Sequence, residues 1–499
     1  MRNWIFFIVT IIAVFFVGLL ISNITDRQAE AKFAYQPKVE IGEGIEPRDS
    51  VWGLNYPRQY QSYMKTADTT YNSPYLSSGR RDALGESPEM AILWAGYGFS
   101  KDYNQPRGHY YAIDDINQSL RTGAPMEEGE GPMPSTCWTC KSPDVPRLMN
   151  EIGVTEFYDQ KFSDIGDEII NPIGCADCHD SKTMNLSITR PALIEAYDAM
   201  GKDITKASHQ EMRSLVCAQC HVEYYFKKDN PGDKKGSNYL TFPWKDGMTM
   251  EDMEAYYDQE GFYDWINPLS KTKMLKAQHP DYELYKTSVH AKRGVSCADC
   301  HMPYKSEGGQ KFTDHHIGSP LTNVENSCFV CHRENVDQLI SDVYERQAKV
   351  KEGSKYLQME IAKAHIEAKK AWDLGAVQEQ MDVIQKGIRQ AQWRWDFSVA
   401  SHGASFHSPL EVSRIISSGI GKIQEARIEL TRLLNSLGHT EPVEMPNFNS
   451  KKEIQAYIGL DIPQLKKEKK EFIEQVVPQW LEKGMEREKK IKNKDLVTN

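Results

Sequence analysis

The ten cysteines of this chain fall into five pairs of the form Cys-x-x-Cys. The residue immediately after each pair is one that can bind a metal. Two cysteines at this spacing can form thioether bonds to the vinyl groups of one haem, and a histidine in the next position then reaches the iron. The sequence therefore predicts five covalently bound haem c groups. The sets are Cys137, Cys140 and Lys141; Cys175, Cys178 and His179; Cys217, Cys220 and His221; Cys297, Cys300 and His301; and Cys328, Cys331 and His332.

Zinc and disulfides are the two other uses of paired cysteines, and neither explains the residue after each pair. A structural zinc site needs its cysteines to converge in fours, and a histidine directly after a pair is not the usual zinc spacing. Disulfides suit an exported protein, but they place no requirement on the next residue. Histidine accounts for only 14 of 499 residues, so four histidines at one fixed position favour haem.

Lys141 breaks the histidine pattern. An iron held by two histidines has no vacant position for a substrate, so it mainly carries electrons. A lysine binds iron only as the neutral amine, which a bound cation favours by displacing the proton. We interpret the haem at Lys141 as a catalytic haem with an open face. The alternative is that Lys141 is a surface residue beside a haem that is ligated from elsewhere.

The elements that must position these haems divide into a loop-rich region and a region of long helices. Residues 53–333 contain all five pairs, are rich in Gly, Pro, Tyr and Asp, and predict only short helices, such as 190–200 and 249–257. Residues 334–440 repeat apolar residues at three- and four-residue spacing, which predicts long amphipathic helices. Residues 441–499 predict a charged, solvated, partly helical tail. We expect a mainly α multihaem cytochrome c in which the cofactors supply much of the core.

The N-terminus predicts export. Residues 1–22 contain an apolar run close to the roughly 17 to 20 residues that cross a bilayer, and residues 23–52 predict a linker. The one small-residue cleavage motif, Ala29-Glu30-Ala31, lies about ten residues beyond the apolar run. We therefore favour a signal anchor over a cleaved signal peptide. In both cases the bulk of the chain lies in the periplasm or at the outer face of the cytoplasmic membrane.

Composition restricts the partners. The chain has 60 Lys and Arg against 70 Asp and Glu, a formal net charge of -10. Nucleic acids and anionic lipid surfaces repel a protein of this charge, so we expect no nucleic acid as a partner. The 499 residues suffice for up to three ordinary domains, although shared cofactors can merge such domains into one.

One Cys-x-x-Cys-Lys pair followed by four Cys-x-x-Cys-His pairs resembles pentahaem cytochrome c nitrite reductase, the ammonia-forming enzyme. The likeness covers about residues 50–440 and extends to segments between the pairs. These are Arg121, sixteen residues before Cys137; Val222-Glu223-Tyr224-Tyr225; Lys276-Ala277-Gln278-His279-Pro280; Thr313-Asp314-His315; and the stretch from Trp393-Arg394-Trp395 to His407-Ser408-Pro409.

The resemblance implies a six-electron reduction of nitrite to ammonium at the Lys141 haem, with Arg121, Tyr224 and His279 lining its open face. Arginine offers fixed donors to an oxyanion, and histidine exchanges protons near neutral pH. Two other functions remain open. One is a multihaem electron-transfer conduit, if another side chain fills the position opposite Lys141. The other is reduction of hydroxylamine, sulfite or tetrathionate.

The resemblance also implies the remaining ligands. It assigns the distal histidines His109 to the third haem, His290 to the fifth, His315 to the second and His407 to the fourth, with His316 and His402 as alternatives to the last two. It implies calcium at the oxygen atoms of Glu223, Tyr224, Lys276 and Gln278, which are hard ligands. The histidines without an assigned role, which we expect to be packed or solvated, are His209, His365 and His439.

Two protein partners follow from the same resemblance. Residues 334–440 are expected to pack against a second copy of the chain in a homodimer. The electron donor is expected to be a membrane-anchored, quinol-oxidising multihaem cytochrome. Neither partner was inferred from composition or periodicity.

Overall fold

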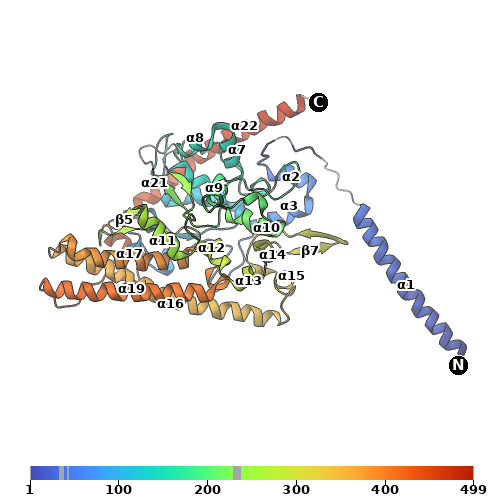
Figure 1. Ribbon diagram of the computed structural model, residues 1–499. Coiled ribbons are helices and arrows are strands. Elements are labelled where there is room, and N and C mark those ends of the chain that lie inside the picture. The colour runs from blue at the N-terminus through green and yellow to red at the C-terminus, as the bar shows by residue number, and fades with distance from the viewer. Residues whose placement is uncertain (1, 33–38, 42–43, 229–237, 498–499) are drawn as a thin grey trace.

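The computed structural model describes residues 2–32, 39–41, 44–228 and 238–497. Long helices lie along one side of a body of loops and short helices (Figure 1). The strands of the described residues form only small two-stranded antiparallel sheets. The predicted fold class, mainly α with long helices after a loop-rich region, is confirmed.

The loop-rich region is built from short elements. Its α-helices are α2 (Asp49–Asn55), α3 (Pro57–Tyr63), α4 (Ala83–Glu86), α5 (Met90–Leu93), α6 (Ala112–Gln118), α7 (Asp144–Ile152), α8 (Val154–Tyr158), α9 (Pro191–Ala199), α10 (His209–Ala218), α11 (Met250–Gln259), α12 (Asp281–Lys286), α13 (Val289–Lys292), α14 (Cys297–His301) and α15 (Val324–Ser327). Its 3-10 helices are η1 (Met64–Ala67), η2 (Gly98–Ser100), η3 (His109–Tyr111), η4 (Leu120–Thr122), η5 (Ser135–Trp138), η6 (Cys175–Asp177), η7 (Ile204–Lys206) and η8 (Pro320–Thr322). Its strand pairs are β1 (Arg81–Asp82) with β2 (Asn104–Gln105), β3 (Tyr225–Lys227) with β4 (Tyr239–Thr241), β5 (Trp265–Ile266) with β6 (Lys273–Met274), and β7 (Tyr304–Glu307) with β8 (Gln310–Thr313).

Local sequence explains where several of these helices begin. The two short helices predicted from the sequence are confirmed as α9 and α11. Thr249 caps α11 by accepting a hydrogen bond from the Asp252 amide at 3.1 Å, while the Asp252 carboxylate accepts one from the Thr249 amide. This reciprocal arrangement satisfies two amides that a helix leaves without internal partners.

Three long helices follow the last cysteine pair: α16 (Val336–Asp373), α17 (Gln378–Ala400) and α19 (Pro409–Ser436), with the short α18 (Ala404–His407) before α19. Asn335 caps α16 by accepting a hydrogen bond from the Gln338 amide at 2.8 Å. Proline in the first turn starts α19, where its missing N–H costs nothing. The chain leaves α16 through Gly375, whose φ of 93° favours glycine.

The three long helices pack closely because glycine stands at two of their contacts. A Cβ atom at Gly387 of α17 would lie 2.8 Å from the Cβ of Ala426 on α19, and one at Gly419 would lie 2.6 Å from Leu357. Both distances are shorter than carbon atoms tolerate. The helices bury a shared apolar face that includes Leu357, Ile361, Ile384, Ile388, Ile415, Ile423 and Leu430.

Helix α17 also joins the bundle to the loop-rich body. The ring of Trp395 lies 5.5 Å from that of Trp94, and the Trp393 indole N–H donates to the Met250 carbonyl at 3.1 Å. Next to them, Asp396 and Lys276 form a fully buried ion pair at 2.8 Å. Each buried tryptophan removes roughly 150 to 250 Å² of mostly apolar surface from water, so this contact fixes the two regions against each other.

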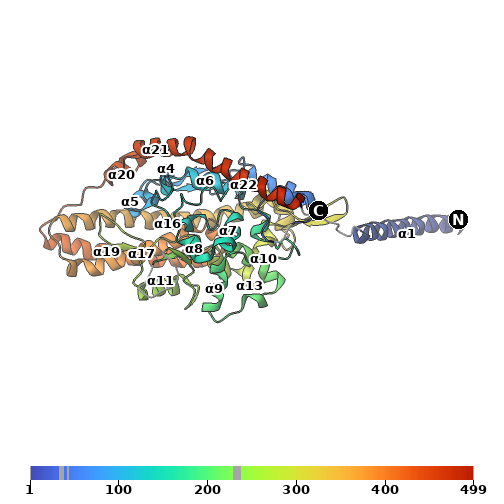
Figure 2. The same ribbon diagram turned by 90° about the horizontal axis from the view of Figure 1, so that it is seen from above.

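The C-terminal segment differs from the expected solvated tail. Its helices α20 (Lys451–Tyr457), α21 (Ile462–Gln475) and α22 (Val477–Val497) lie along the side of the body formed by α4 and α6 (Figure 2). Ile454 and Phe472 are fully buried, and Trp480 packs against Phe162. The charged face of these helices dominates the sequence pattern, while a few residues on the opposite face bind the body.

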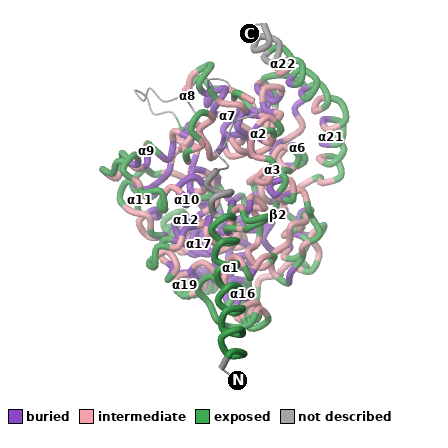
Figure 3. The backbone as a smooth tube through the Cα atoms, turned by 90° about the vertical axis from the view of Figure 1, so that its right-hand side faces the viewer, coloured by how far each residue is buried: buried purple, intermediate pink, exposed green. Residues whose placement is uncertain are grey.

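The N-terminal helix α1 (Arg2–Lys32), unlike the C-terminal helices, does not lie along the body. It extends away from the body, and its apolar side chains from Trp4 to Ile24 are exposed (Figures 1 and 3). Residues Asn3–Thr25 are long and apolar enough to cross a membrane, with a mean hydropathy of 3.0 and no buried residue. Exposing this many apolar side chains to water is unfavourable, so the helix requires an apolar environment of another kind.

Candidate haem sites and reaction pocket

All ten cysteines line one cavity, with a volume of about 1980 Å³. A pocket for a single small ligand measures roughly 300 to 1,000 Å³, so this space suits several large groups in contact. Lys141 and the histidine that follows each of the other four pairs line the same cavity. Many aromatic and aliphatic side chains complete the walls, so the lining suits apolar macrocycles.

The cysteine pairs lie against one another in a defined order. The thiol of Cys140 in the first pair contacts Cys220 in the third, and Cys217 of the third pair contacts Cys297 in the fourth. Cys178 of the second pair lies beside Cys220, and Cys300 of the fourth pair lies beside the fifth. The third pair therefore connects the first, second and fourth pairs, and the fifth pair follows the fourth.

At four of the five pairs, a second histidine faces the histidine of the pair. The ring centres are 6.3 Å apart for His179 and His315, for His221 and His109, and for His332 and His290, and 6.2 Å apart for His301 and His407. A bond from a metal to imidazole nitrogen is about 2 Å long, so two rings on opposite sides of one metal have centres about 6 Å apart. The spacing fits an iron between each pair of rings.

Burial keeps many of these imidazoles neutral, the form that binds a metal. It is the main cause that lowers the pKa of His109 to about 3 and the pKa values of His315 and His407 to about 4. His221 differs. Burial opposes its charged form, but the hydrogen bond and charge of Asp281 raise its pKa overall. Asp281 thus orients the His221 ring through Nδ1.

The alternatives for two distal positions lie elsewhere. His402 faces His279, with ring centres 6.4 Å apart, rather than any histidine that follows a cysteine pair. His316 lines the cavity, but its backbone N–H bonds to Asp314 and its ring is not the one that faces His179. The geometry therefore favours His315 and His407.

The histidines without an assigned role also have definite places. His365 is buried and hydrogen-bonded through both ring nitrogens, to Ser270 Oγ at 2.8 Å and Gln392 Oε1 at 2.9 Å. His209 is exposed at the start of α10, although it lies at the cavity edge. His439 follows α19, where its amide donates to the Leu434 carbonyl. His365 is thus a packed histidine, as expected.

The first cysteine pair has a different environment. The turn that carries Lys141 is held on both sides by Arg190, which donates to the carbonyls of Thr139 at 3.0 Å and Ser142 at 2.8 Å. Arg190 itself is fully buried and paired with Asp177 at 2.6 Å. Among the described residues, no group accepts a hydrogen bond from Lys141 Nζ. The backbone is fixed while the amine is left free.

Arg121 reaches the same cavity from η4. Its Nε donates to Ser119 Oγ at 3.1 Å and lies 3.8 Å from Asp102 Oδ1, and its guanidinium lies over the Phe99 ring at 4.3 Å. Within the described ranges of the chain, Nη1 and Nη2 have no hydrogen-bond acceptor. One edge of the guanidinium is therefore anchored and the other is available to an anion.

Tyr224 and His279 complete this group. Their ring centres are 6.5 Å apart, and both line the cavity. Burial raises the pKa of Tyr224 well above its usual value, so the phenol keeps its proton. Burial and the nearby Lys141 hold the pKa of His279 well below its usual range. We call Arg121, Lys141, Tyr224 and His279 the reaction pocket.

The residues assigned to calcium are contiguous in space. Glu223 is fully buried, and its carboxylate accepts hydrogen bonds from the Gln278 amide at 2.6 Å and the Tyr257 hydroxyl at 2.9 Å. The Gln278 side chain reaches the Lys276 carbonyl at 3.2 Å. Burial is the main cause that raises the pKa of Glu223 well above its usual value. A buried carboxylate beside carbonyl and amide oxygens fits a hard cation, which would restore its charged form.

Comparison with known proteins decides the family. The cytochrome c552 family profile matches residues 49–490. The chain belongs to the cytochrome c552 family. Cytochrome c-552 of Parabacteroides distasonis is 54% identical over 492 residues, which cover 99% of this chain and 98% of that protein. Cytochrome c-552 of Bacteroides thetaiotaomicron is 55% identical over 483 residues, 97% of each chain.

A solved structure extends this cytochrome c552 comparison to three dimensions. Cytochrome c nitrite reductase from Desulfovibrio desulfuricans is 31% identical and superposes with a TM-score of 0.74, covering 85% of this chain and 91% of that one. The catalytic subunit of that enzyme has two calcium sites. The predicted family resemblance is confirmed.

Two contributors to this cytochrome c552 site were not found from the sequence. Arg190 clamps the Lys141 turn, and Asp281 orients His221 and accepts a hydrogen bond from Ser401. Asp281 stands two residues after His279, inside a recognised motif, so its position could have drawn attention. Arg190 directly precedes α9 and belongs to no recognised motif, so only the fold brings it beside Lys141.

Proposed function

We propose that this cytochrome c552 reduces nitrite to ammonium in the reaction pocket. The reaction consumes six electrons and eight protons per nitrite and releases two water molecules. The observation that carries the proposal is the contrast between the pairs: four have a facing histidine, while the first has Lys141 with Arg121, Tyr224 and His279 in the same cavity. When bound there, haem c supplies a vacant iron position and the electrons.

Arg121 supplies the anion specificity. Its free Nη1 and Nη2 can donate to the two oxygens of nitrite in a bidentate manner, while Ser119 and Phe99 hold the rest of the side chain. The charge is fixed before nitrite arrives, so little reorganisation is needed on binding. The products, ammonium and water, carry no negative charge and have no comparable attraction to the guanidinium.

His279 and Tyr224 supply the proton pathway. The imidazole of His279 is neutral, because burial disfavours the cation, so a proton that it takes up from water is released readily to a substrate oxygen. Tyr224 keeps its hydroxyl proton and can donate a hydrogen bond to a ligand. Each nitrite oxygen must leave as water, and these two groups offer protons beside the Arg121 anion site.

The four facing histidine pairs support an electron-transfer role, because two imidazoles leave an iron no vacant position. With the first pair they make five haem c groups. Each of four haem irons would be held by one facing pair of histidines, namely His179 and His315, His221 and His109, His301 and His407, and His332 and His290. The contacts between cysteine pairs support a path from the fifth pair through the fourth and third to the first.

Glu223, Tyr224, Lys276 and Gln278 are proposed to hold a calcium ion. The buried carboxylate of Glu223 supports this assignment, and so does the presence of calcium sites in the related enzyme. Because Tyr224 and Gln278 are neighbours of Glu223 and His279 along the chain, an ion here would stiffen the backbone on which two pocket residues stand. Calcium would therefore act on geometry, not on electron transfer.

The protein environment can also be proposed. The exposed apolar α1 supports an anchor in the cytoplasmic membrane with the body in the periplasm, where a membrane-anchored, quinol-oxidising multihaem cytochrome would supply electrons. Exposed apolar residues on the long helices support a homodimer through residues 334–440, among them Val383 at 69% and Ile428 at 52% exposure. If mass spectrometry finds that the mature protein begins at Lys32, the N-terminal segment is a cleaved signal peptide and not an anchor.

The decisive test of this function is an electron balance. The purified holoprotein, supplied with a reduced dye, should form one ammonium per nitrite and oxidise six electron equivalents. If the protein instead passes electrons from the dye to an acceptor protein and leaves nitrite intact, it is an electron conduit. Equal turnover of sulfite or tetrathionate would show that nitrite is not the selected substrate.

A further inference from the structure

Lys469 is a buried lysine on the otherwise mostly charged and exposed helix α21. Helix α21 turns one face to the body, and Leu465, Lys469 and Phe472 share it at helical spacing. Lys469 is 6% exposed, whereas its neighbour Lys470 is exposed. An apolar residue would serve packing better at this position, because lysine is almost never buried without specific partners. The partners therefore indicate what the residue does.

Lys469 binds both ends of the segment that carries Arg121. Its Nζ donates to the Asn117 carbonyl at 3.0 Å, at the end of α6, and to Thr122 Oγ1 at 3.1 Å, in η4. The ammonium group also lies 4.7 Å from the centre of the Phe472 ring. Asn117 and Thr122 bracket Arg121, so one side chain from the C-terminal region closes the turn that presents the guanidinium.

Asp102 holds the same turn from the other direction. Its carboxylate accepts hydrogen bonds from the Leu120 amide at 2.8 Å and Ser119 Oγ at 3.2 Å. Ser119 Oγ in turn accepts the hydrogen bond from Arg121 Nε. The charge of Asp102 acts on Lys469 as well and partly offsets the burial, which lowers the pKa of Lys469 to about 7. Asp102 thus has a second cation near it and does not pair with Arg121 alone.

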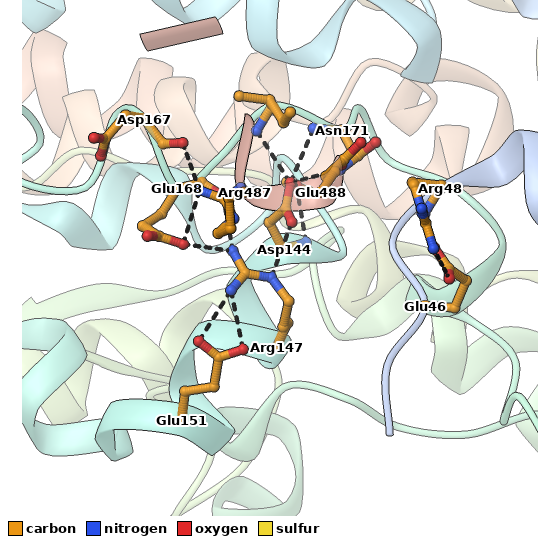
Figure 4. A network of polar contacts seen from close by, with 12 residues as sticks. Glu46, Arg48, Asp144, Arg147, Glu151, Asp167, Glu168, Asn171, Arg487 and Glu488 are labelled. Carbon is orange, nitrogen blue, oxygen red and sulfur yellow. Dashed lines mark hydrogen bonds and ion pairs between the residues drawn. The ribbon is translucent and has the colours of Figure 1, made fainter. Parts of the chain in front are cut away.

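Other residues of the C-terminal helices reinforce this arrangement. Gln455 of α20 donates to the carbonyls of Ser100 at 3.0 Å and Lys101 at 2.9 Å, directly before Asp102. On α22, Glu488 accepts a hydrogen bond from Asn171 at 2.7 Å, and Asn171 also binds Asp144 at the start of α7 (Figure 4). Asp144 lies three residues after Lys141. The C-terminal helices therefore hold segments on both sides of the reaction pocket.

We propose that Lys469 is a positioning residue for nitrite: it fixes the 117–122 segment, and α20 to α22 form a clamp that keeps the Arg121 guanidinium aimed at the anion. The proposal rests on the function assigned to Arg121 above. It requires that loss of Lys469 weakens the binding of an anion in particular, because only the anion depends on the guanidinium. A merely structural role would weaken every ligand alike.

The test compares Lys469→Met with Lys470→Met in the holoprotein. Methionine keeps the length of the side chain and its contact with Phe472 but donates no hydrogen bond. We expect the Kd of nitrite for the oxidised protein, measured by optical titration, to rise about tenfold in Lys469→Met. KM for nitrite should rise in proportion while kcat stays within about twofold. Lys470→Met should match the unaltered protein.

Two further measurements separate positioning from general damage. The affinity for nitric oxide, a ligand without charge, should stay unchanged in Lys469→Met, and amide exchange in residues 117–122 should become about tenfold faster. Unchanged nitrite affinity, or equal weakening of nitrite and nitric oxide, would overturn the proposal. If Lys469→Met does not fold, Thr122→Val removes one of the two acceptors at nearly constant shape and should weaken nitrite binding in the same direction.

The exchange measurement also separates this inference from the proposed function. If the unaltered protein does not reduce nitrite, the function fails by the ammonium assay, whatever Lys469 does. Unaltered exchange in residues 117–122 of Lys469→Met would overturn the clamp even in an active nitrite reductase. The two conclusions therefore fail on different readouts.

Discussion

The first cysteine pair and the other four share one chemical motif but have opposite surroundings. At the four pairs, a histidine from a distant segment faces the histidine of the pair, with ring centres 6.2 or 6.3 Å apart. At the first pair, Lys141 is accompanied by Arg121, Tyr224 and His279, whose polar groups face the cavity. The same cofactor can thus conduct electrons or react, depending on whether a second ligand closes it.

The two kinds of site also need different amounts of support from the surrounding fold. The four facing histidines come from loops and short helices on several sides of the cavity, and in the proposed function each needs only to reach one iron. The reaction pocket needs a fixed guanidinium, a fixed amine and a neutral imidazole together. Additional residues hold its backbone: Arg190 at Lys141, and Lys469 and Asp102 at the turn of Arg121.

Arg121→Gln should have the largest effect on this contrast. Loss of a preorganised charged donor at an anion site lowers kcat/KM by roughly 100- to 1,000-fold, and we expect this decrease for nitrite reduction by steady-state assay. Arg80→Gln is the matched control, because Arg80 lines the same cavity but pairs with Asp115 at 2.6 Å. Comparable losses in both variants would mean that Arg121 contributes only general positive charge.

The next effect concerns a histidine outside both groups. Burial lowers the pKa of His365 to about 4, so its contribution to stability is complete above pH 6.5 and is lost as the pH falls toward 4. The loss at pH 4 should reach about 3 kcal/mol. His365→Asn should remove this part of the acid dependence of Tm, measured by calorimetry, while its haem spectrum stays unchanged. An altered spectrum would place His365 among the haem ligands.

Lys141→His should have a smaller effect. The substitution gives the first pair the same motif as the others but leaves its open face, so haem should still attach. We expect nitrite turnover to fall about tenfold, because the residue that would hold the iron tunes its reactivity, and an imidazole differs from an amine in that respect. Haem content by absorbance is the control for assembly. Unchanged turnover would mean that the lysine has no special role.

His315→Ala should have the smallest effect, and it tests the contrast at one of the four pairs that have a facing histidine. Removing the ring that faces His179 opens a second iron without adding an anion-binding group. The high-spin signal in electron paramagnetic resonance should therefore about double, and nitrite should perturb only the original half. A nitrite response from the new open iron would show that the groups around Lys141 are not needed for binding.

The sequence predicted the residues that could do chemistry better than the residues that hold them in place. The haem motifs and the long helices followed from local spacing, because covalent attachment and amphipathic helices leave signatures in neighbouring residues, and the family followed from a resemblance. The order of contact between the pairs did not, since it depends on how distant loops meet. The charged residues 441–499 looked solvated, because a few buried residues such as Lys469 and Phe472 carry the contact.

The two ends of the chain illustrate the same limit. Both looked peripheral in sequence, yet α1 leaves the body and α20 to α22 pack against it beside the reaction pocket (Figures 1 and 2). Apolar content identified α1 as a helix long and apolar enough to cross a membrane. Lys469 could not be distinguished from its charged neighbours, because its role depends on two oxygen atoms, of Asn117 and Thr122, far away in the chain.

Electron paramagnetic resonance of the oxidised holoprotein, with and without nitrite, tests the central claim most directly. One high-spin iron should accompany four low-spin irons, and nitrite should convert only the high-spin signal, with Arg121→Gln requiring more nitrite for the same change. Five low-spin irons that do not respond to nitrite would contradict the account, because the first pair would then be closed like the others.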